Sequence, residues 1–531
     1  MIALAGRWGL LLVWIGALAL GFALRALPLT AARPYIAYID EGNFLHPAFR
    51  LVKKGGWDPE LYVYPQFPIS AVVAAARAVD PLYRSLRGRS LRDRIPERSE
   101  IYDELEPFAL LLIARCLSLA LGLGTIALTG LLAMRLAGPR AGAAAALLAA
   151  VTPALVLRGS IAAVDAYATI FVLACLYLTD LTRTSSRAGL PSFLAGAMAG
   201  AAFGSKYPSV LVLVAFGVTT LAQRTAWREK LHRLCLAGLG LPVGAVLAMP
   251  ALLQHPGEVF GAIAFQSRAY AEFSSPPLWK QAFLRAEWDF LYKRAELGFV
   301  FVGLAAWGWV LGLRDRKIAA TFWGWCAFAT SGLVLYGTRS FQPFRNLMPL
   351  VPVACIAVAL LYVRLRQRAR RPLAADALAL AWVILAFAVP LTGYAISRYR
   401  LEDSRTQAIN WLMTRVRPDD QVLVVHELAF LRQEVERLPA KLRVQWWDQA
   451  VPEIGATRPR FVLGGVLQRW EGLVDLAVHP AIGADYELRL RIGSNPTPGN
   501  PWWHGNHQVI YVFERKTRSV TAFLCPQEPA S

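Results

Sequence analysis

Long apolar stretches alternate with short polar connections along the first three quarters of the chain. Each stretch holds about 17–23 residues with almost no charge, enough for a helix to cross a hydrocarbon core of ~30 Å. The first stretch carries one charge, Arg25. We expect about eleven membrane-spanning helices, at residues 8–29, 108–134, 141–157, 164–181, 191–205, 207–223, 234–253, 297–313, 318–337, 347–363 and 373–392. The pattern predicts an all-α polytopic membrane protein.

Basic residues are concentrated in every second connection. With the N-terminus in the cytoplasm, the short cytoplasmic loops hold sixteen Lys and Arg and three acidic residues, whereas the short outer loops hold four basic residues. Such an asymmetry orients membrane proteins. A cleaved signal peptide at residues 8–29 is the alternative for the first stretch, and it leaves Asp40 on the same outer side.

The net charge of +20 does not indicate a nucleic-acid partner. Most of this charge lies in the cytoplasmic loops and therefore belongs to the topology. The long outer segment 30–106 balances eleven basic residues against eleven acidic ones. The cytoplasmic loops are too short to bind a nucleotide, and no phosphate-binding glycine-rich loop follows a strand.

Two outer loops and a tail interrupt the apolar pattern. The first outer loop, 30–106, begins with a predicted short amphipathic helix, followed by an apolar segment, 67–79, that we expect to lie along or dip into the outer leaflet. We expect a solvated helical excursion over 84–106. The second large outer loop is 254–296, so the membrane domain is 1–392 and the tail is 393–531.

The tail has the pattern of a small α/β domain on the outer face. A helix over 404–416, with Ser404 as its expected N-cap, places its apolar positions on one face. Those positions are Ala408, Ile409, Leu412 and Val416. Five strands are expected at "VLVVHE", "LRVQWW", "PRFVLGGV", "YELRLRI" and "HQVIYVFER".

Polar residues from separate segments are expected on one side of the membrane, at one depth. The candidate acids are Asp40, Glu41 and Asp165, the candidate cations are Lys206, Arg339 and Arg345, and the candidate hydroxyls are Tyr62 and Tyr64. Structural alternatives exist for each: Lys and Arg near span ends extend to lipid headgroups, and Asp at a helix start caps it. Two adjacent acids near a membrane repel one another, which favours a functional role for Asp40 and Glu41.

Such a set suits group transfer from a lipid-linked donor. A carboxylate can take the proton of an acceptor hydroxyl as its oxygen attacks, and cations can neutralise a phosphate leaving group. Apolar walls between helices can hold an isoprenoid chain.

Four segments resemble the C-type (GT-C fold) membrane glycosyltransferases, in the branch of protein O-mannosyltransferases and lipid A aminoarabinose transferases. The similar segments are "YIDEGNFLHPAFRLVKKGGWDPELYVYPQFPISAV", the section from Arg115 through the Pro153 turn to Asp165, "FLAGAMAGAAFGSKYPSVLVLV" and "FRNLMPLVPVACIAVALL". They occur in the family's order and cover roughly residues 8–365. The charged stretch 84–106 is longer than the family pattern leads us to expect, and the tail matches no part of it, which leaves the acceptor open.

The resemblance implies an inverting transferase of the bacterial inner membrane that uses a polyprenyl-phosphate sugar. It assigns the general base to Asp40 and a supporting acid to Asp165. Lys206, Arg339 and Arg345 become candidate ligands of the donor phosphate, and Tyr62 and Tyr64 candidate substrate contacts. No cofactor is required; an acidic cluster could hold a divalent metal, but no spacing indicates one.

The acceptor could be a protein, a lipid or a polysaccharide. Two other functions remain open from the sequence: a lipid or sugar transporter, and a non-catalytic subunit for envelope assembly. A transporter is expected to carry charges near the middle of its spans, whereas these residues lie at span ends.

Overall fold

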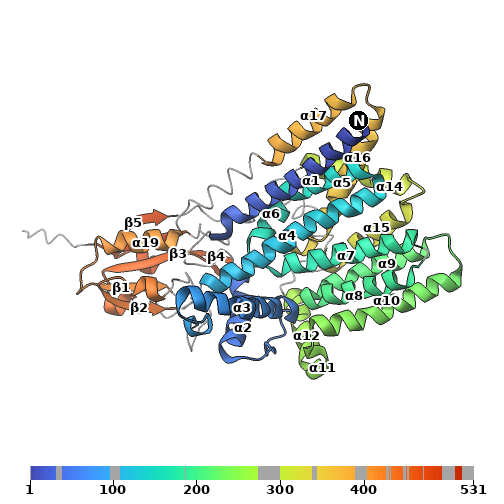
Figure 1. Cartoon of the computed structure of the whole chain (residues 1–531). Helices are drawn as coiled ribbons and strands as arrows, with labels where there is room; N and C mark the ends of the chain where they lie inside the picture. The colour runs from blue at the N-terminus through green and yellow to red at the C-terminus, as the bar shows by residue number, and fades with distance from the viewer. Residues whose placement is uncertain are drawn as a thin grey trace, which may run out of the picture. The chain divides into compact units, whose positions relative to one another are not determined.

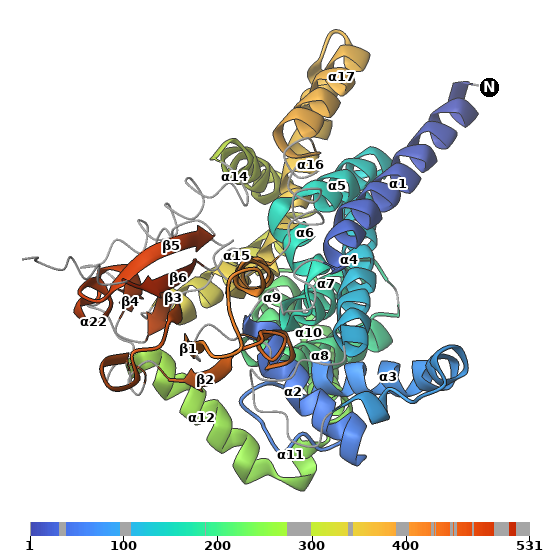
Figure 2. The same ribbon diagram turned by 90° about the vertical axis from the view of Figure 1, so that its left-hand side faces the viewer.

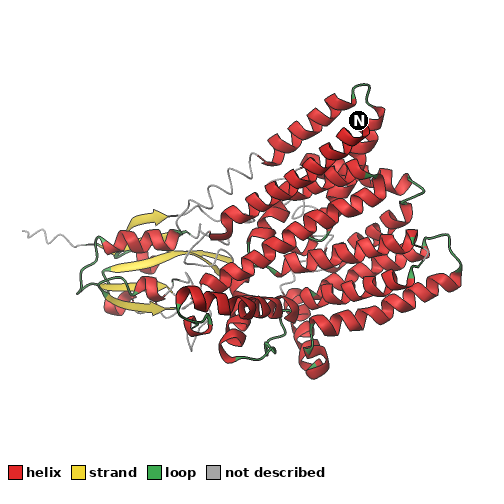
Figure 3. Ribbon diagram, viewed as in Figure 1, coloured by secondary structure: helices red, strands yellow, loops and turns green. Residues whose placement is uncertain are grey.

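The computed structural model describes residues 2–30, 39–95, 108–185, 187–272, 299–337, 344–388, 403–425, 430, 432–446, 450, 454–469, 472–492 and 509–516. The chain divides near residue 401 into two compact units. In the described residues the first unit contains only helices, and all strands belong to the second (Figure 3).

The first unit is a bundle of helices that follows the apolar pattern of the sequence (Figure 1). Its elements are α1 (Ile2–Ala26), η1 (Leu27–Thr30), α2 (Ile39–Lys54), α3 (Gln66–Arg87), η2 (Arg92–Arg94), α4 (Phe108–Ala137), α5 (Pro139–Val151), α6 (Pro153–Ser160), α7 (Val164–Thr184), α8 (Gly189–Ser205), η3 (Tyr207–Leu211), α9 (Val212–Leu221), α10 (Trp227–Ala248), α11 (Ala251–Gln254), α12 (Pro256–Glu272), α14 (Phe299–Arg314), α15 (Ala319–Gly337), η4 (Phe344–Leu347), α16 (Leu350–Arg368), α17 (Pro372–Val383) and the π-helical turn η5 (Ile384–Ala388).

Each of the eleven predicted spans is at least partly helical, but their number is not confirmed. Five helices are long and apolar enough to cross a membrane, and a sixth span results if α5 and α6 are counted together. Four other apolar helices, such as Pro372–Val383, are shorter. A helix of 15 residues rises only about 22 Å, less than the hydrocarbon thickness.

The predicted span 141–157 is two helices rather than one. α5 ends at Val151, and α6 starts at Pro153 after a bend of 60°. Pro153 has no backbone N–H and so cannot continue the hydrogen-bond ladder of α5. The bend turns α6 and its following connection toward the start of α7.

Helices α8 and α10 pack with their backbones in close contact (Figures 1 and 2). A Cβ atom on Gly196 would lie 2.0 Å from the Ala237 carbonyl oxygen, and one on Gly244 would lie 1.9 Å from the Ala197 carbonyl oxygen. Small residues allow such close approach of membrane helices. This contact fixes α8, whose C-terminal end is followed by Lys206.

The first outer segment forms two helices, α2 and α3, as expected. The predicted apolar helix over 67–79 is longer than its apolar pattern and continues to Arg87. It ends at Gly88, whose φ of 68° is the left-handed conformation that favours glycine. Of the expected excursion over 84–106, the structure describes only this end, the short η2 and the residues to 95.

The second unit is a small α/β domain, and most of its elements match the expected ones. They are α19 (Ser404–Met413), β1 (Gln421–Val425), α20 (Arg432–Val435), β2 (Lys441–Gln445), β3 (Phe461–Arg469), β4 (Gly472–Asp475), η7 (Leu476–Val478), α22 (Pro480–Gly483), β5 (Tyr486–Ile492) and β6 (Ile510–Arg515). The strand order is β2-β1-β3-β6-β5, and β4 pairs with β3. β1 is parallel to β2 and β3, whereas β6 is antiparallel to β3 and β5.

The helix at the start of this domain buries the predicted face. Ala408, Ile409 and Leu412 are fully buried in the core of the domain. The N-cap prediction was wrong by one residue, because the cap is Asp403, whose carboxylate accepts from the Arg405 backbone N–H. Strand β4 was not predicted.

Candidate functional site

Glu41 lies at the start of α2 and is completely buried. Its two carboxylate oxygens accept from Nε and Nη2 of Arg115 on α4, each at 2.9 Å. Nη1 of Arg115 donates to the Leu29 carbonyl oxygen at 2.7 Å. This two-point ion pair fixes the start of α2 and the segment after α1 against α4.

The same carboxylate holds the connection between α6 and α7. The Ala162 backbone N–H donates to Oε1 of Glu41 at 2.7 Å. Asp165 follows only three residues later, in the first turn of α7. Glu41 is therefore placed to position this connection. Its neighbour Asp40 belongs to α2, but the side chain of Asp40 lies outside the described ones.

Asp165 and Lys206 form the second buried ion pair. Nζ of Lys206 is 2.6 Å from Oδ1 of Asp165, and the two side chains are 14% and 4% exposed. Asp165 lies at the N-terminal end of α7, where the helix dipole favours a negative charge. Lys206 follows the C-terminal end of α8. The consecutive helices α7 and α8 thus bring together two residues, 41 positions apart, that the sequence had singled out.

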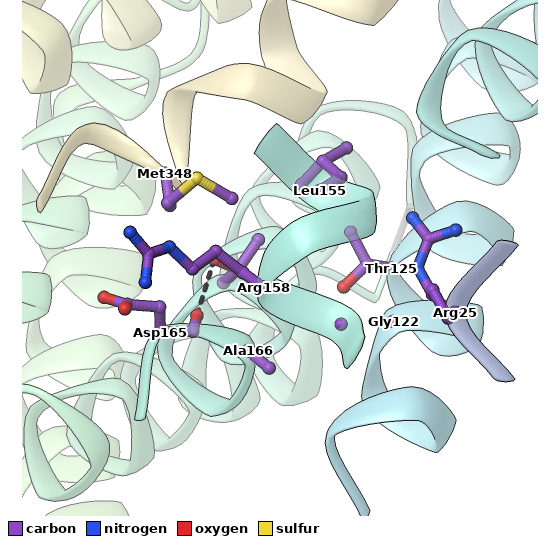
Figure 4. A pocket seen from close by; sticks show the side chains of 10 residues that line it. Arg25, Gly122, Thr125, Leu155, Arg158, Asp165, Ala166 and Met348 are labelled. Carbon is purple, nitrogen blue, oxygen red and sulfur yellow. Dashed lines mark hydrogen bonds between the residues drawn. The ribbon is translucent and has the colours of Figure 1, made fainter. Parts of the chain in front are cut away.

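A narrow pocket adjoins this pair (Figure 4). It is lined by Arg25, Gly122, Thr125, Leu155, Arg158, Gly159, Asp165, Ala166, Thr169 and Met348. Figure 4 shows the side chains of Arg158 and Asp165 directed toward one another, with Met348 beside them. The enclosed space of about 10 Å³ has room for roughly one water molecule.

Tyr62 makes hydrogen bonds within the protein through both its hydroxyl and its backbone carbonyl. Its hydroxyl donates to the Asp58 carboxylate at 2.8 Å, and its carbonyl accepts from the Tyr207 hydroxyl. Burial, and then the bond to Asp58, raise the pKa of Tyr62 well above its ordinary value, so it stays a hydrogen-bond donor. Nε2 of His255 lies 3.1 Å from the same Asp58 carboxylate. Tyr64 is partly buried nearby in the sequence.

The structure does not describe the side chains of the two predicted phosphate ligands Arg339 and Arg345. Arg339 lies outside the described residues, and Arg345 belongs to η4 with its side chain outside the described ones. Met348, three residues after Arg345, lines the pocket. Among the side chains that the structure describes, no group of three or more His, Cys, Asp or Glu could hold a metal ion.

Sequence reasoning did not assign three arginines to the site: Arg25, Arg115 and Arg158. A signal existed for Arg25, because it is the one charge in the first apolar stretch. Arg115 likewise is the one charge in the predicted span 108–134. Arg158 was counted only as an outer-loop charge, although it lies in α6.

Comparisons with known proteins are consistent with this architecture. Residues 110–253 match the family model described as dolichyl-phosphate-mannose-protein mannosyltransferase. A comparison with curated proteins gives no match.

Solved structures resemble the chain at low identity, among them the following two. ArnT from Cupriavidus metallidurans bound to undecaprenyl phosphate has 14% identity and a TM-score of 0.55, with 95% of this chain and 98% of that chain covered. The apo oligosaccharyltransferase of Archaeoglobus fulgidus has 12% identity and a TM-score of 0.52, with 86% and 69% covered. The chain is a membrane protein with the GT-C fold of these glycosyltransferases, and residues 110–253 carry the mannosyltransferase family pattern.

Proposed function

We propose that the protein transfers a glycosyl group from a polyprenyl-phosphate-linked sugar to an acceptor hydroxyl at the outer face of the membrane. The observation that carries this proposal is the buried Asp165–Lys206 pair beside Arg158, in a chain with the GT-C fold. ArnT, which has the same fold, was crystallised with undecaprenyl phosphate. In this scheme the cations bind the donor phosphate, and the acids take the proton of the acceptor hydroxyl and orient the sugar.

The two adjacent acids take different roles in this scheme. Adjacent positions of a helix are about 100° apart, and Glu41 is already held by Arg115. Glu41 therefore acts as a positioning residue, and Asp40 takes the proton of the acceptor hydroxyl. The acceptor oxygen bonds to the anomeric carbon as the bond from that carbon to the phosphate oxygen breaks on the opposite face. The configuration is inverted, and polyprenyl phosphate leaves.

Lys206, Arg339 and Arg345 are the proposed ligands of the leaving phosphate, while Asp165 orients Lys206 and the sugar. Tyr62 supports the outer segment, and Tyr64 is a proposed substrate contact. The acceptor can be a protein, a lipid or a polysaccharide.

An apolar groove offers a place for the isoprenoid chain. It has a volume of about 700 Å³ and runs between α9 and α15, with Val218, Trp323 and Val334 in its lining. Only η3 separates Lys206 from α9. A lipid whose phosphate contacts Lys206 can therefore extend its chain along α9.

The proposed location is the bacterial inner membrane, with the N-terminus in the cytoplasm and the second unit outside. The basic loops support this orientation. α4 and α7 each carry an arginine in the last turn, Arg135 and Arg183 respectively, at the ends that this orientation places in the cytoplasm.

The test is release of free polyprenyl phosphate by the purified protein in lipid bilayers. Polyprenyl-phosphate hexoses and pentoses are supplied with extracted envelope acceptors. Wild type should release the carrier, Asp40→Asn should be slower by roughly 10²–10⁴-fold, and Asp40→Glu should keep part of the activity because it retains a carboxylate. Equal rates for wild type and Asp40→Asn would assign the base elsewhere. No release with any donor would contradict sugar transfer, and lipid translocation would then be measured.

A further inference from the structure

A second polar pocket, the α2–α3 pocket, lies between two helices that pack side by side (Figures 1 and 2). It has a volume of about 430 Å³. A water molecule takes up about 30 Å³ of the liquid, so the pocket has room for a phosphate group together with several water molecules. All the residues that line it are described, and among them are Gly56, Arg77, Asp80, Arg84, Ser90 and Arg92.

One wall of this pocket is the turn that follows α2, held by an arginine of α3. Gly55 and Gly56 have φ angles of 89° and 87°, the left-handed region in which glycine is favoured. Nη2 of Arg77 donates to the Gly56 carbonyl oxygen at 2.6 Å and to the Leu51 carbonyl oxygen at 3.3 Å. Cζ of Arg77 also lies 4.3 Å from the centre of the Trp57 ring. Arg77 is therefore fixed at the edge of the pocket.

A second wall is the segment after α3, held by the carboxylate of Asp80. This carboxylate accepts from the Ser90 hydroxyl at 2.8 Å and from the Leu91 backbone N–H at 2.6 Å. The Ser90 oxygen in turn accepts from the Arg92 backbone N–H at 3.1 Å. Leu91 is buried, so this segment is packed against the protein. The pocket is preformed, which lowers the free-energy cost of binding a ligand there.

Positive charge exceeds negative charge in the lining of this pocket. Three lining residues are arginines, Arg77, Arg84 and Arg92, and one is an acid, Asp80, so the net charge is +2. Nη2 of Arg84 lies 3.4 Å from the Asp80 carboxylate, but Arg84 is 65% exposed, which makes the pair weak. In the part of the chain that the structure describes, the side chain of Arg92 forms no ion pair or hydrogen bond. An anion in the pocket would compensate this charge.

The opposite side of α3 is apolar and exposed. Val79, Leu82 and Leu86 are 39%, 62% and 73% exposed, and their spacing places them on one face of the helix. Leu82 and Leu86 follow Asp80 and Arg84 by two positions, about 200° round the helix. When a helix lies on a membrane, its apolar face reaches the acyl chains and its polar face lies among the headgroups. In this membrane protein, such a placement of α3 sets the pocket at the level of the lipid phosphates.

The α2–α3 pocket is remote from the candidate base. Asp40 lies in the first turn of α2 and Val52, which lines the pocket, in the last. The twelve residues between these positions correspond to a rise of about 18 Å. A phosphate bound here is therefore a different group from the phosphate of a sugar donor at the site described above.

We propose that the α2–α3 pocket binds the phosphate of an anionic phospholipid, with Arg84 and Arg92 as its ligands. A guanidinium fork matches two phosphate oxygens. A headgroup with a net negative charge compensates the cations better than a zwitterionic one, which adds no net charge. The bound lipid holds the segment from α2 to α3 at the membrane surface. This inference is independent of the proposed function, because it needs no sugar donor.

The test is a titration of the purified full chain, in neutral detergent, with fluorescent phosphatidylglycerol and with phosphatidylcholine of the same acyl chains. Wild type should bind phosphatidylglycerol more tightly than phosphatidylcholine. Arg84→Gln and Arg92→Gln should each weaken phosphatidylglycerol binding by roughly tenfold, because hydrogen bonds to charged groups are strong. Arg92→Lys should keep part of the affinity, since it retains the charge but loses the fork. A wild-type protein that does not prefer phosphatidylglycerol would overturn the site.

Matched controls come from the same end of α3. Arg87 and Arg89 are exposed and close in the sequence, but neither lines the pocket. Arg87→Gln and Arg89→Gln remove the same charge and should leave the affinity near that of wild type. A general attraction between basic residues and anionic lipid would instead weaken with every charge removed. Equal losses in the pocket variants and in these controls would overturn a specific site.

Soluble glycerol phosphate separates a lipid from a free phosphate as the ligand. It carries the phosphate without acyl chains and should bind much more weakly than phosphatidylglycerol. The double variant Leu82→Ser with Leu86→Ser should weaken binding of the lipid, because it removes apolar contact, and should leave glycerol phosphate unaffected. Equal affinities for glycerol phosphate and phosphatidylglycerol would show that the ligand is not a lipid.

Discussion

Helices α4 and α7 each carry a charged residue near both ends, and the two ends are built differently. At one end, Arg135 of α4 bonds directly to Asp180 of α7, with Nε and Oδ2 3.0 Å apart. At the other end, Arg115 of α4 pairs with Glu41, and Asp165 of α7 pairs with Lys206. The direct pair joins the two helices, whereas the separated pairs leave a pocket beside them.

Burial also differs between the two ends. Arg135 and Arg183, which share Asp180, are 24% and 19% exposed. Arg115 is fully buried, as is Arg25 beside the pocket. A charge that reaches solvent or headgroups costs little, whereas a buried charge needs an opposite charge or hydrogen bonds. Glu41 supplies these to Arg115, and backbone carbonyl oxygens supply them to Arg25. The pair at the Asp180 end joins two helices directly, whereas at the Asp165 end the pairs are separate and a pocket lies beside them; the proposed function places binding at this second end.

The largest expected effect comes from breaking the buried pair. Arg115→Met leaves Glu41 buried without its cation and should lower the free energy of unfolding by about 3–5 kcal/mol. Arg135→Met should lower the free energy of unfolding by clearly less, because Asp180 still pairs with Arg183 and both arginines are partly exposed. Thermal unfolding in detergent measures both. Equal losses at the two ends would remove the distinction, and the double variant Arg115→Met with Glu41→Met should regain part of the stability.

The next effect concerns the donor. Lys206→Met should raise the KM for a polyprenyl-phosphate sugar by roughly 10- to 150-fold, the range of one charge-assisted hydrogen bond of about 1.5–3 kcal/mol. Lys206 pairs with Asp165 at one end of α7, and Arg183 pairs with Asp180 at the other end. Arg183→Met removes the cation from Asp180 and should leave this KM unchanged. Steady-state kinetics of carrier release distinguish the two, and an equal change of KM in both would contradict the assignment of Lys206.

The smallest effect tests the space around Arg25. Gly159→Ala places a Cβ atom 2.7 Å from Nε of Arg25, and crowding of this kind costs about 1–2 kcal/mol. Gly238→Ala on α10 meets no atom within 4 Å and should be neutral or slightly stabilising. Unfolding of the two variants under the same conditions gives the difference, and equal stabilities would show that Arg25 is not tightly held.

The sequence predicted elements well where one pattern decides the structure. Asp165 is at a helix start and Lys206 at a helix end because apolar stretches begin and end there. Strand β5 has the bounds expected from its alternating residues. The cap at Asp403 was missed because Asp and Ser are adjacent there and both are good caps.

Other features depend on contacts that local patterns do not contain. Arg115 and Glu41 are 74 residues apart, and nothing in either segment identifies the partner. The break at Pro153 was expected as a turn, but its carbonyls are capped by Arg25, more than 120 residues earlier. The number of spans is not confirmed, because an apolar stretch can form two bent helices, as α5 and α6 do, or one helix shorter than the hydrocarbon thickness.

The most direct test compares two aspartates of the same helix, Asp165→Asn and Asp180→Asn. Both are buried and both bond cations, so both variants should lose some stability. Carrier release from a polyprenyl-phosphate sugar, measured per folded molecule in bilayers, should fall by at least tenfold in Asp165→Asn and remain near wild type in Asp180→Asn. Equal activity of the two variants would contradict the claim that the Asp165 end carries the function.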